Sequence, residues 1–289
     1  LYAITAISQN KNLGKSPLKL DDWGLAESGP RIYIYDSSCS EPRMKLSITH
    51  PEIDSRILQI AMASSYPTLK ENIRKAYDNV AVKYAEWTKS SYPTRVQYLQ
   101  KLLACLPPAP VEKSVLELGC GSGQPCTAIL ASDPAMKVTA NDISPVQLSL
   151  AKEHLPSANV ALIEGDMMEL SFGDHSFDAV IAMYSILHLP KEEQVTLLKR
   201  IFKWLKPGAL FLGSFAAGLK EEDLFDKHWL DGTDGEMFWS GWGEERTCEI
   251  VSLIGFELIL REVVAEIEEE KGEGREIPFL WVLGKKPDN

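Results

Sequence analysis

The feature that most constrains the fold is a glycine-rich turn directly after a short apolar segment. Residues 114–118 have the composition of a buried strand, and Gly119, Gly121 and Gly123 follow them. A helix is predicted directly afterwards, over residues 124–132. Because glycine adopts positive φ angles at little cost and has no Cβ, a ligand can lie against its bare backbone. The pattern therefore predicts a strand–turn–helix unit at which the chain approaches a bound molecule.

The spacing of the three glycines narrows the class of ligand. The turn reads G-x-G-x-G, whereas the dinucleotide-binding fingerprint is G-x-G-x-x-G. The phosphate-binding pattern G-x-x-x-x-G-K-[ST] does not occur in the sequence. A dinucleotide enzyme is therefore disfavoured, and an ordinary turn without a ligand is the alternative interpretation.

Apolar and helical segments alternate along the chain after this turn. Strands are predicted at 114–118, 137–141, 159–163, 178–184, 209–215, 256–267 and 278–283, and helices at 124–132, 144–154, 191–205 and 244–254. Such alternation is typical of an α/β fold built on a doubly wound, mostly parallel sheet.

Two carboxylates follow predicted strands at the edge where such sheets bind ligands. Asp142 ends the strand next to the glycine turn, where it can accept both hydroxyls of a ribose. Its alternative interpretation is a cap for the helix that begins near Ser144. Asp166 follows the next apolar segment and can accept from an exocyclic amine, while Met167 packs on a purine face.

The part of the chain before the glycine turn is predicted to be largely helical from residue 69 onward. Apolar side chains recur at three- and four-residue spacing over 69–89, which predicts an amphipathic helix. A second helix is predicted over 95–106 and ends before a Pro-Pro pair. Residues 1–50 match no motif and are interpreted as an extension of uncertain order.

Four segments, taken together, resemble the class I S-adenosylmethionine-dependent methyltransferases, of the small-molecule type 11 or UbiE-like kind. They are the cofactor loop at 117–123, a ribose-binding segment at 141–144, an adenine-contacting segment at 165–167 and the turn at 205–210. The resemblance covers roughly residues 70–289, and Ala209 stands where a second glycine is usual. It implies a Rossmann-like seven-stranded sheet with an antiparallel edge hairpin, S-adenosyl-L-methionine as cofactor and S-adenosyl-L-homocysteine as product.

The resemblance also implies which residues bind the cofactor. These are Tyr77, Tyr84, Glu117, Gly119, Gly121, Gly123, Asp142, Ile143, Asp166, Met167 and Met183. The two tyrosines belong to a segment similar to the family's lid helix, for which packing in the core is the alternative. We therefore expect an extension at 1–50, a helical lid segment at 51–110 and a cofactor-binding catalytic domain at 111–289, with an aromatic cap insertion at 216–243.

The insertion at 216–243 follows a predicted strand and is rich in aromatic residues. Aromatic rings over a pocket suit a planar or cationic small molecule. We expect the substrate pocket to include His228, Trp229, Phe238, Trp239 and Trp242. Packing of the insertion against the sheet is the alternative interpretation.

Methyl transfer from a sulfonium depends mainly on alignment and exclusion of water. If the acceptor is a hydroxyl or an ammonium, a base must take its proton. His188 is the first candidate because its ordinary pKa lies near neutrality, and Tyr184 is the second. We expect a methyltransferase acting on an O, N or S atom of a small molecule. A non-methylating rearrangement in the same pocket and a non-catalytic binding protein are the alternatives.

Composition excludes some partners. The net charge of −11 disfavours binding to phosphate backbones, so no nucleic-acid partner is expected. The five cysteines are scattered and no histidines have metal-ligand spacing, so we expect neither disulfides nor a metal. There is no bilayer-length apolar run and no leader pattern, so no membrane partner is expected and the predicted location is cytoplasmic. The sequence does not indicate an oligomeric state.

Overall fold

The structure is a computed structural model in two compact units, Leu1–Leu69 and Lys70–Asn289. It describes residues 2–4, 32–34, 46–48, 55–107, 111–155, 158–219, 223–270 and 273–288. In the first unit, three short strands form a sheet, β1 (Tyr2–Ile4), β2 (Ile32–Ile34) and β3 (Leu46–Ile48). The rest of the predicted N-terminal extension lies outside the described residues.

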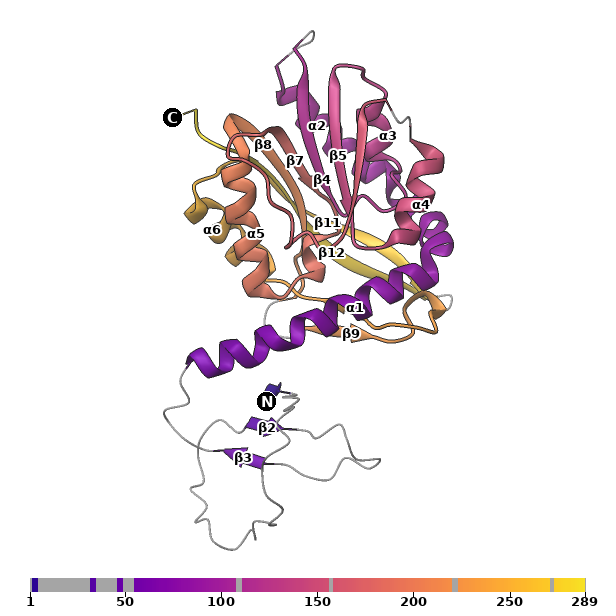
Figure 1. Ribbon diagram of the computed structural model, residues 1–289, viewed down its shortest axis with the longest axis vertical. Coiled ribbons are helices and arrows are strands. Elements are labelled where there is room, and N and C mark those ends of the chain that lie inside the picture. The colour runs from indigo at the N-terminus through magenta and orange to yellow at the C-terminus, as the bar shows by residue number, and fades with distance from the viewer. Residues whose placement is uncertain are drawn as a thin grey trace, which may run out of the picture. The chain divides into compact units, whose positions relative to one another are not determined.

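A seven-stranded sheet is the framework of the second unit (Figure 1). Its strands are β4 (Lys113–Leu118), β5 (Met136–Asp142), β6 (Val160–Glu164), β7 (Phe177–Ala182), β8 (Leu205–Ala216), β11 (Glu257–Glu270) and β12 (Glu273–Lys285). Their order across the sheet is β11-β12-β8-β7-β4-β5-β6. The strands from β8 to β6 pair in parallel, whereas β12 is antiparallel to both neighbours. The predicted parallel sheet with an antiparallel edge hairpin is confirmed.

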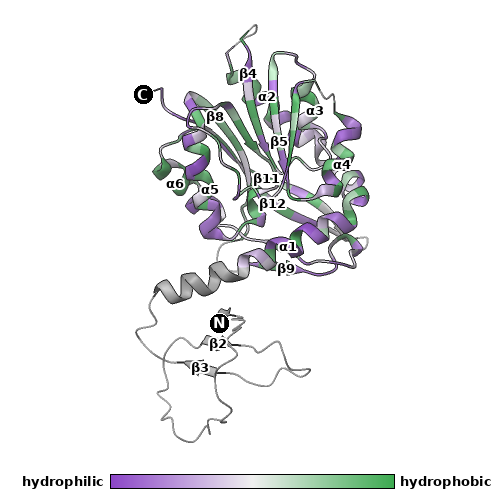
Figure 2. Ribbon diagram, viewed as in Figure 1, coloured by the Kyte–Doolittle hydropathy of each residue, from purple (hydrophilic) through white to green (hydrophobic). Residues whose placement is uncertain are grey.

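Helices cover both faces of this sheet. These helices are α2 (Tyr92–Cys105), α3 (Cys126–Ala131), α4 (Pro145–His154), α5 (Lys191–Trp204) and α6 (Gly243–Ile254). A further helix, α1 (Ser55–Trp87), begins in the first unit and belongs to the second from Lys70 onward. One hydrophobic core joins α2, α3 and α4 to one face, and a second joins α5 and α6 to the other. Val115 and Leu116, neighbours on β4, lie in different cores because successive strand side chains point to opposite faces. Both faces are thus buried, and the central strands are rich in buried apolar residues (Figure 2).

Several boundaries differ from the sequence prediction, and two of the differences affect the carboxyl edge of the sheet. The helix predicted from residue 124 begins only at Cys126, after Pro125 as its N-cap residue. The strand predicted to reach residue 184 ends at Ala182. Tyr184 has a positive φ of 56°, so the chain turns there into a short 3-10 helix at Ile186–His188. This turn directs the side chains after β7 toward the carboxyl edge of the sheet.

Part of the aromatic insertion is fastened to α1. The insertion contains an antiparallel pair, β9 (Leu224–Asp226) and β10 (Met237–Trp239). Between them, Glu236 N donates to Asn72 O at 3.3 Å and Thr233 N donates to Asn79 Oδ1 at 2.8 Å. Gly235 sits against the helix backbone, since a Cβ added there would lie 2.3 Å from Ala76 N. We call residues 229–236 the strap.

Two absences concern only the residues that the structure describes. None of their helices has the length and apolar character needed to cross a bilayer. Within the same ranges, no three His, Cys, Asp or Glu side chains converge in an arrangement that could hold a metal ion.

Gly235→Ala is expected to lower the free energy of unfolding by about 1–3 kcal/mol, because Gly235 has a φ of 81° and no room for a Cβ. Urea denaturation followed by circular dichroism measures this change. Gly173→Ala is the matched control, since its added Cβ would make an ordinary 3.5 Å contact with Ser176 Oγ. Equal effects of the two substitutions would contradict the close approach of the strap to α1.

Candidate functional site

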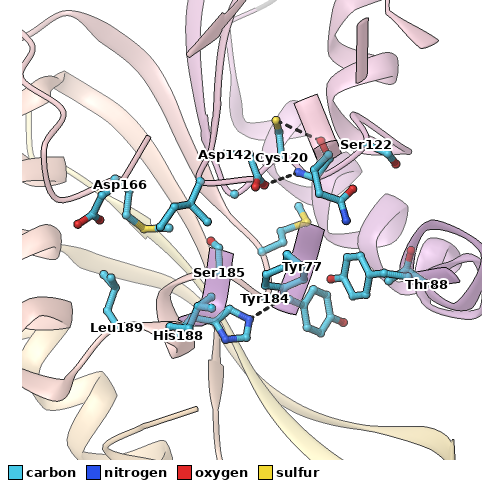
Figure 3. A pocket seen from close by; sticks show the side chains of 18 of the residues that line it. Tyr77, Thr88, Cys120, Ser122, Asp142, Asp166, Tyr184, Ser185, His188 and Leu189 are labelled. Carbon is cyan, nitrogen blue, oxygen red and sulfur yellow. Dashed lines mark hydrogen bonds between the residues drawn. The ribbon is translucent and has the colours of Figure 1, made fainter. Parts of the chain in front are cut away.

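A cavity lies at the carboxyl ends of β4, β5 and β7, where α1 forms one of its walls (Figure 3). It encloses about 800 Å³ of space outside atoms, part of it open to solvent. The residues predicted from sequence that line it are Tyr77, Tyr84, Gly119, Gly121, Asp142, Ile143, Asp166, Met167, Met183, Tyr184 and His188. We call it the first pocket. Residues from five separate segments of the sequence thus meet in one place.

Two of the predicted cofactor residues do not line this pocket. Glu117 is buried beneath the turn and accepts a hydrogen bond from Thr127 Oγ1 at 2.7 Å. Burial raises the pKa of the Glu117 carboxyl to about 7. Gly123 serves packing, because a Cβ there would lie 2.7 Å from Leu155 Cδ1. Both residues therefore support the turn from outside the cavity.

The other two glycines of the turn have different surroundings. A Cβ on Gly119 would lie 2.4 Å from Ser185 Cβ, so this glycine allows two loops to pack together. A Cβ on Gly121 would have as its nearest neighbour Gln147 Oε1, at 3.8 Å. Because Gly121 lines the cavity, that added atom would project into the space a ligand needs. Gly121 is therefore the position at which bare backbone faces the pocket.

Asp142 links the glycine turn to the start of α4. Its Oδ2 accepts from Gly121 N at 2.8 Å, and its Oδ1 accepts from Ser144 N at 2.9 Å. The N-cap of α4 is Ser144, whose hydroxyl oxygen accepts from Gln147 N. Burial raises the pKa of the Asp142 carboxyl to about 6. Each carboxylate oxygen accepts one backbone N–H and keeps capacity for a ligand hydroxyl.

Asp166 is bridged to α1 by a lysine that the sequence analysis did not single out. Lys70 Nζ donates to Asp166 Oδ2 at 2.6 Å and to Glu193 Oε1 at 2.9 Å. Asp166 Oδ1 also accepts from Met168 N at 2.9 Å. The Lys70–Asp166 pair joins residues 96 positions apart, and no local pattern marks such a partner.

His188 is held between a carbonyl and a tyrosine. Its Nδ1 lies 2.7 Å from Phe238 O, which can only accept, so Nδ1 carries the proton. Its Nε2 lies 2.8 Å from Tyr77 Oη and accepts from that hydroxyl (Figure 3). Burial lowers the pKa of His188 to about 4, so the ring is neutral near pH 7. A hydrogen bond to Tyr77, which lines the cavity, thus occupies the basic nitrogen of His188.

Tyr184, the second predicted catalytic residue, is already engaged as a donor. Its hydroxyl donates to Glu266 Oε1, and the Arg95 guanidinium lies 4.3 Å from its ring centre. Burial raises the pKa of Tyr184 well above its usual range. These contacts indicate that Tyr184 stabilises the wall of the pocket.

Arg95 and Gln147 also line the cavity, and the sequence analysis singled out neither residue. Arg95 Nε donates to Ser91 Oγ at 2.9 Å, and no carboxylate among the described residues pairs with its guanidinium. The Gln147 side chain is buried, yet neither its Nε2 nor its Oε1 has a hydrogen-bond partner within the part of the chain that the structure describes. A cation and an amide are thus available to a polar ligand.

A second pocket adjoins the first and encloses about 1310 Å³ of space outside atoms. The two pockets share the residues Tyr77, Tyr84, Thr88, Arg95, Tyr184 and His188. Of the predicted substrate residues, Trp229 and Trp239 line the second pocket.

The other three predicted substrate residues lie elsewhere. Phe238 is buried and contributes its carbonyl rather than its ring, since that carbonyl orients His188. Trp242 packs on the core under α5 and α6, and its Nε1 donates to Lys191 O at 3.3 Å. His228 is exposed and lines neither pocket. The aromatic insertion therefore has both a packing role and a pocket-lining role.

Comparisons with known proteins find similarity to methyltransferases. Residues 115–208 match the methyltransferase domain family. The chain is 32% identical to sterol methyltransferase-like 2 of Botryococcus braunii over 50% of its own length and 38% of that protein. It is 30% identical to demethylmenaquinone methyltransferase of Staphylococcus aureus (strain JH9) over 49% of its own length and 58% of that protein. The chain thus spans less than two thirds of the length of either relative.

A solved structure shows the same fold over most of the chain. It is the Burkholderia thailandensis 1,6-didemethyltoxoflavin-N1-methyltransferase, with its substrate and S-adenosylhomocysteine bound. The likeness has a TM-score of 0.51 at 18% identity and covers 86% of this chain and 95% of that one. The seven-stranded, mostly parallel sheet with its antiparallel hairpin matches a Rossmann-like methyltransferase fold.

Gly121→Val is expected to abolish binding of S-adenosylhomocysteine, because its side chain would occupy the first pocket. Isothermal titration calorimetry measures the binding. Circular dichroism checks the fold, which is expected to be kept with some loss of stability, because the added Cβ has free space but Gly121 has a φ of 56°. A Gly121→Val protein that binds normally would disprove the close approach of ligand to backbone.

Asp142→Asn is expected to weaken binding of adenosine by about 1–3 kcal/mol at about pH 8, because a charged acceptor becomes an amide. In the wild type, protonation of Asp142 below its pKa of about 6 removes the same charge, so affinity falls as the pH falls from about 7 to about 5. Calorimetry across this range measures both effects.

The control ligand is 2′-deoxyadenosine, and the control variant is Glu117→Gln, outside the pocket. Asp142→Asn is expected to reduce the preference for adenosine over its deoxy counterpart, which a general loosening of the turn would leave unchanged. An undiminished preference would exclude Asp142 as the ribose acceptor.

Proposed function

We propose that this protein is a methyltransferase that transfers a methyl group from S-adenosyl-L-methionine to an O, N or S atom of a small molecule. The observation that carries the proposal is the junction of the two pockets at Tyr77 and His188. One pocket has bare backbone and a carboxylate beside it, as a nucleoside requires, and the other has aromatic walls. Scattered cysteines support a cytoplasmic location as part of the same proposal.

The residues present fit the cofactor. Gln147 has two unsatisfied amide atoms in the first pocket, close to Gly121, and a bound ribose would supply their missing partners. Asp142 would accept from the ribose hydroxyls, and Met167 would pack on the adenine. The guanidinium of Arg95 would hold the amino-acid carboxylate. The set thus offers hydrogen-bond and charge partners for each part of the molecule.

The proposed proton path uses residues of this chain. When bound, the cofactor supplies an electrophilic methyl group on a positively charged sulfur. The acceptor hydroxyl would give its proton to Tyr77 Oη as the new bond to carbon forms, while Tyr77 passes its own proton to His188 Nε2. The hydrogen bond from Nδ1 to Phe238 O holds the ring in the required tautomer. Because burial lowers the pKa of His188 to about 4, this path suits an acceptor with an acidic proton, such as a phenol, an enol or a thiol.

We also propose that the part of α1 from Lys70 onward acts as a lid over the first pocket. Lys70, Tyr77 and Tyr84 of α1 all line the first pocket, and the strap ties α1 to the wall of the second. Together they would exclude water from the junction, which methyl transfer requires.

Purified protein, isotopically labelled S-adenosyl-L-methionine and a metabolite extract test the activity directly. Labelled product and S-adenosyl-L-homocysteine are expected to form together, and Gly121→Val is expected to form neither. Conversion of a metabolite without S-adenosyl-L-homocysteine would contradict methyl transfer.

Tyr77→Phe and His188→Gln are each expected to lower kcat about 10²-fold with an acceptor that must lose a proton. The double variant is expected to lose no more than either single one, because both residues serve one path. Steady-state kinetics with the acceptor found above measures these values. Tyr92→Phe is the matched control, because Tyr92 lines neither pocket, and it is expected to keep kcat within about threefold. Losses that multiply in the double variant would refute a shared path.

A further inference from the structure

The second pocket runs from the junction toward β9 and the β11–β12 hairpin. Beyond Tyr77 and His188, its walls include Leu187, Leu219, Ile277 and Phe279. These side chains come from four segments of the sequence and all are apolar. These four residues form an apolar part of the wall, and the lining also includes the charged residues Arg95, Asp226, Glu266, Arg275 and Glu276.

The mouth of this pocket exposes apolar side chains. Leu224 on β9 is 40% exposed and Ile267 on β11 is 67% exposed, and both line the pocket. Phe225, next to Leu224, is 57% exposed and packs on Phe238 with ring centres 5.0 Å apart. Exposed apolar side chains that are continuous with a cavity mark a surface that a ligand covers.

Two of the carboxylates that line the pocket have hydrogen-bond donors in the protein itself. Glu266 accepts the Tyr184 hydroxyl, and Asp226 Oδ1 accepts from His228 N at 2.7 Å. The rings of Tyr77, Tyr84 and Trp229 lie 5.1–5.5 Å from one another, centre to centre. Rings this close pack against each other and leave no cage between them for an ammonium group. The walls therefore favour an uncharged, apolar ligand body over a cation.

We propose that the methyl acceptor is an amphipathic small molecule whose hydroxyl-bearing head lies at the Tyr77–His188 junction and whose apolar chain fills the second pocket and leaves it between Leu224 and Ile267. This inference rests on the proposed function, since it gives the substrate class of the same site. Transfer replaces the bond from methyl to sulfur by a bond from methyl to the head oxygen, and the proton of that oxygen passes to Tyr77.

A series of esters tests the inference by chain length. Methyl, butyl and octyl para-hydroxybenzoate share one phenol head and differ only in the apolar chain. Their affinities are measured by calorimetry with the wild-type protein saturated with S-adenosylhomocysteine. The octyl ester is expected to bind at least about tenfold more tightly than the methyl ester, because its added methylene groups leave water.

Variants at the mouth of the second pocket test where the apolar chain of the ester lies. In the double variant Leu224→Glu, Ile267→Glu, the octyl ester is expected to bind less than about threefold more tightly than the methyl ester. The reason is that charged groups replace the two apolar side chains at the rim of the mouth. Leu253→Glu is the matched control, because Leu253 is 78% exposed on α6 and lines neither pocket, and it is expected to keep the wild-type ratio. Thermal unfolding confirms that the variants fold.

The outcomes separate this inference from the proposed function. A wild-type protein that binds S-adenosylhomocysteine but shows equal affinity for the three esters overturns the inference alone. A rim variant with the wild-type ratio, or a Leu253→Glu protein that loses it, also overturns the inference. Failure of the wild type to bind S-adenosylhomocysteine overturns the proposed function, whatever the ester ratio.

Discussion

The attachment of the glycine turn to the end of β5 is the interaction on which the rest of the site depends. Gly119 N and Cys120 N both donate to Asn141 O, at 2.8 and 2.9 Å, and Asp142 accepts from Gly121 N. These bonds satisfy backbone groups that a tight strand-to-helix turn would otherwise leave without partners. They also fix the separation between the bare backbone at Gly121 and the carboxylate of Asp142. The width of the proposed nucleoside site therefore depends on these hydrogen bonds.

The turn after β7 forms part of the wall that the two pockets share. Because β7 ends at Ala182, the next residues leave the sheet and bring Tyr184 and His188 to the wall that both pockets share. The carbonyl of Phe238, from the distant insertion, then selects the tautomer of His188. The protonation state of His188 at the junction therefore depends on how the insertion packs.

Local patterns in the sequence predicted the fold and much of the first pocket. Strand alternation, the glycine turn and the position of Asp142 after β5 depend on neighbouring residues, and topology alone brings strand ends together. The sequence did not reveal Lys70, Arg95 or Gln147, because their place depends on contacts between distant segments. The sequence analysis also expected the side chains of Glu117 and Phe238 to line the pockets. Glu117 lies beneath the turn, and Phe238 acts through its backbone, which no side-chain pattern encodes.

The join between the strap and α1 is made backbone to backbone, with Gly235 against the main chain of Ala76. Contacts of this kind do not yield by rotation of a side chain. Any displacement of α1 from the first pocket must therefore draw Trp229, and with it a wall of the second pocket, in the same direction. Entry of one reactant and release of the other would share a single mechanical step, so the two compartments would exchange their contents in concert.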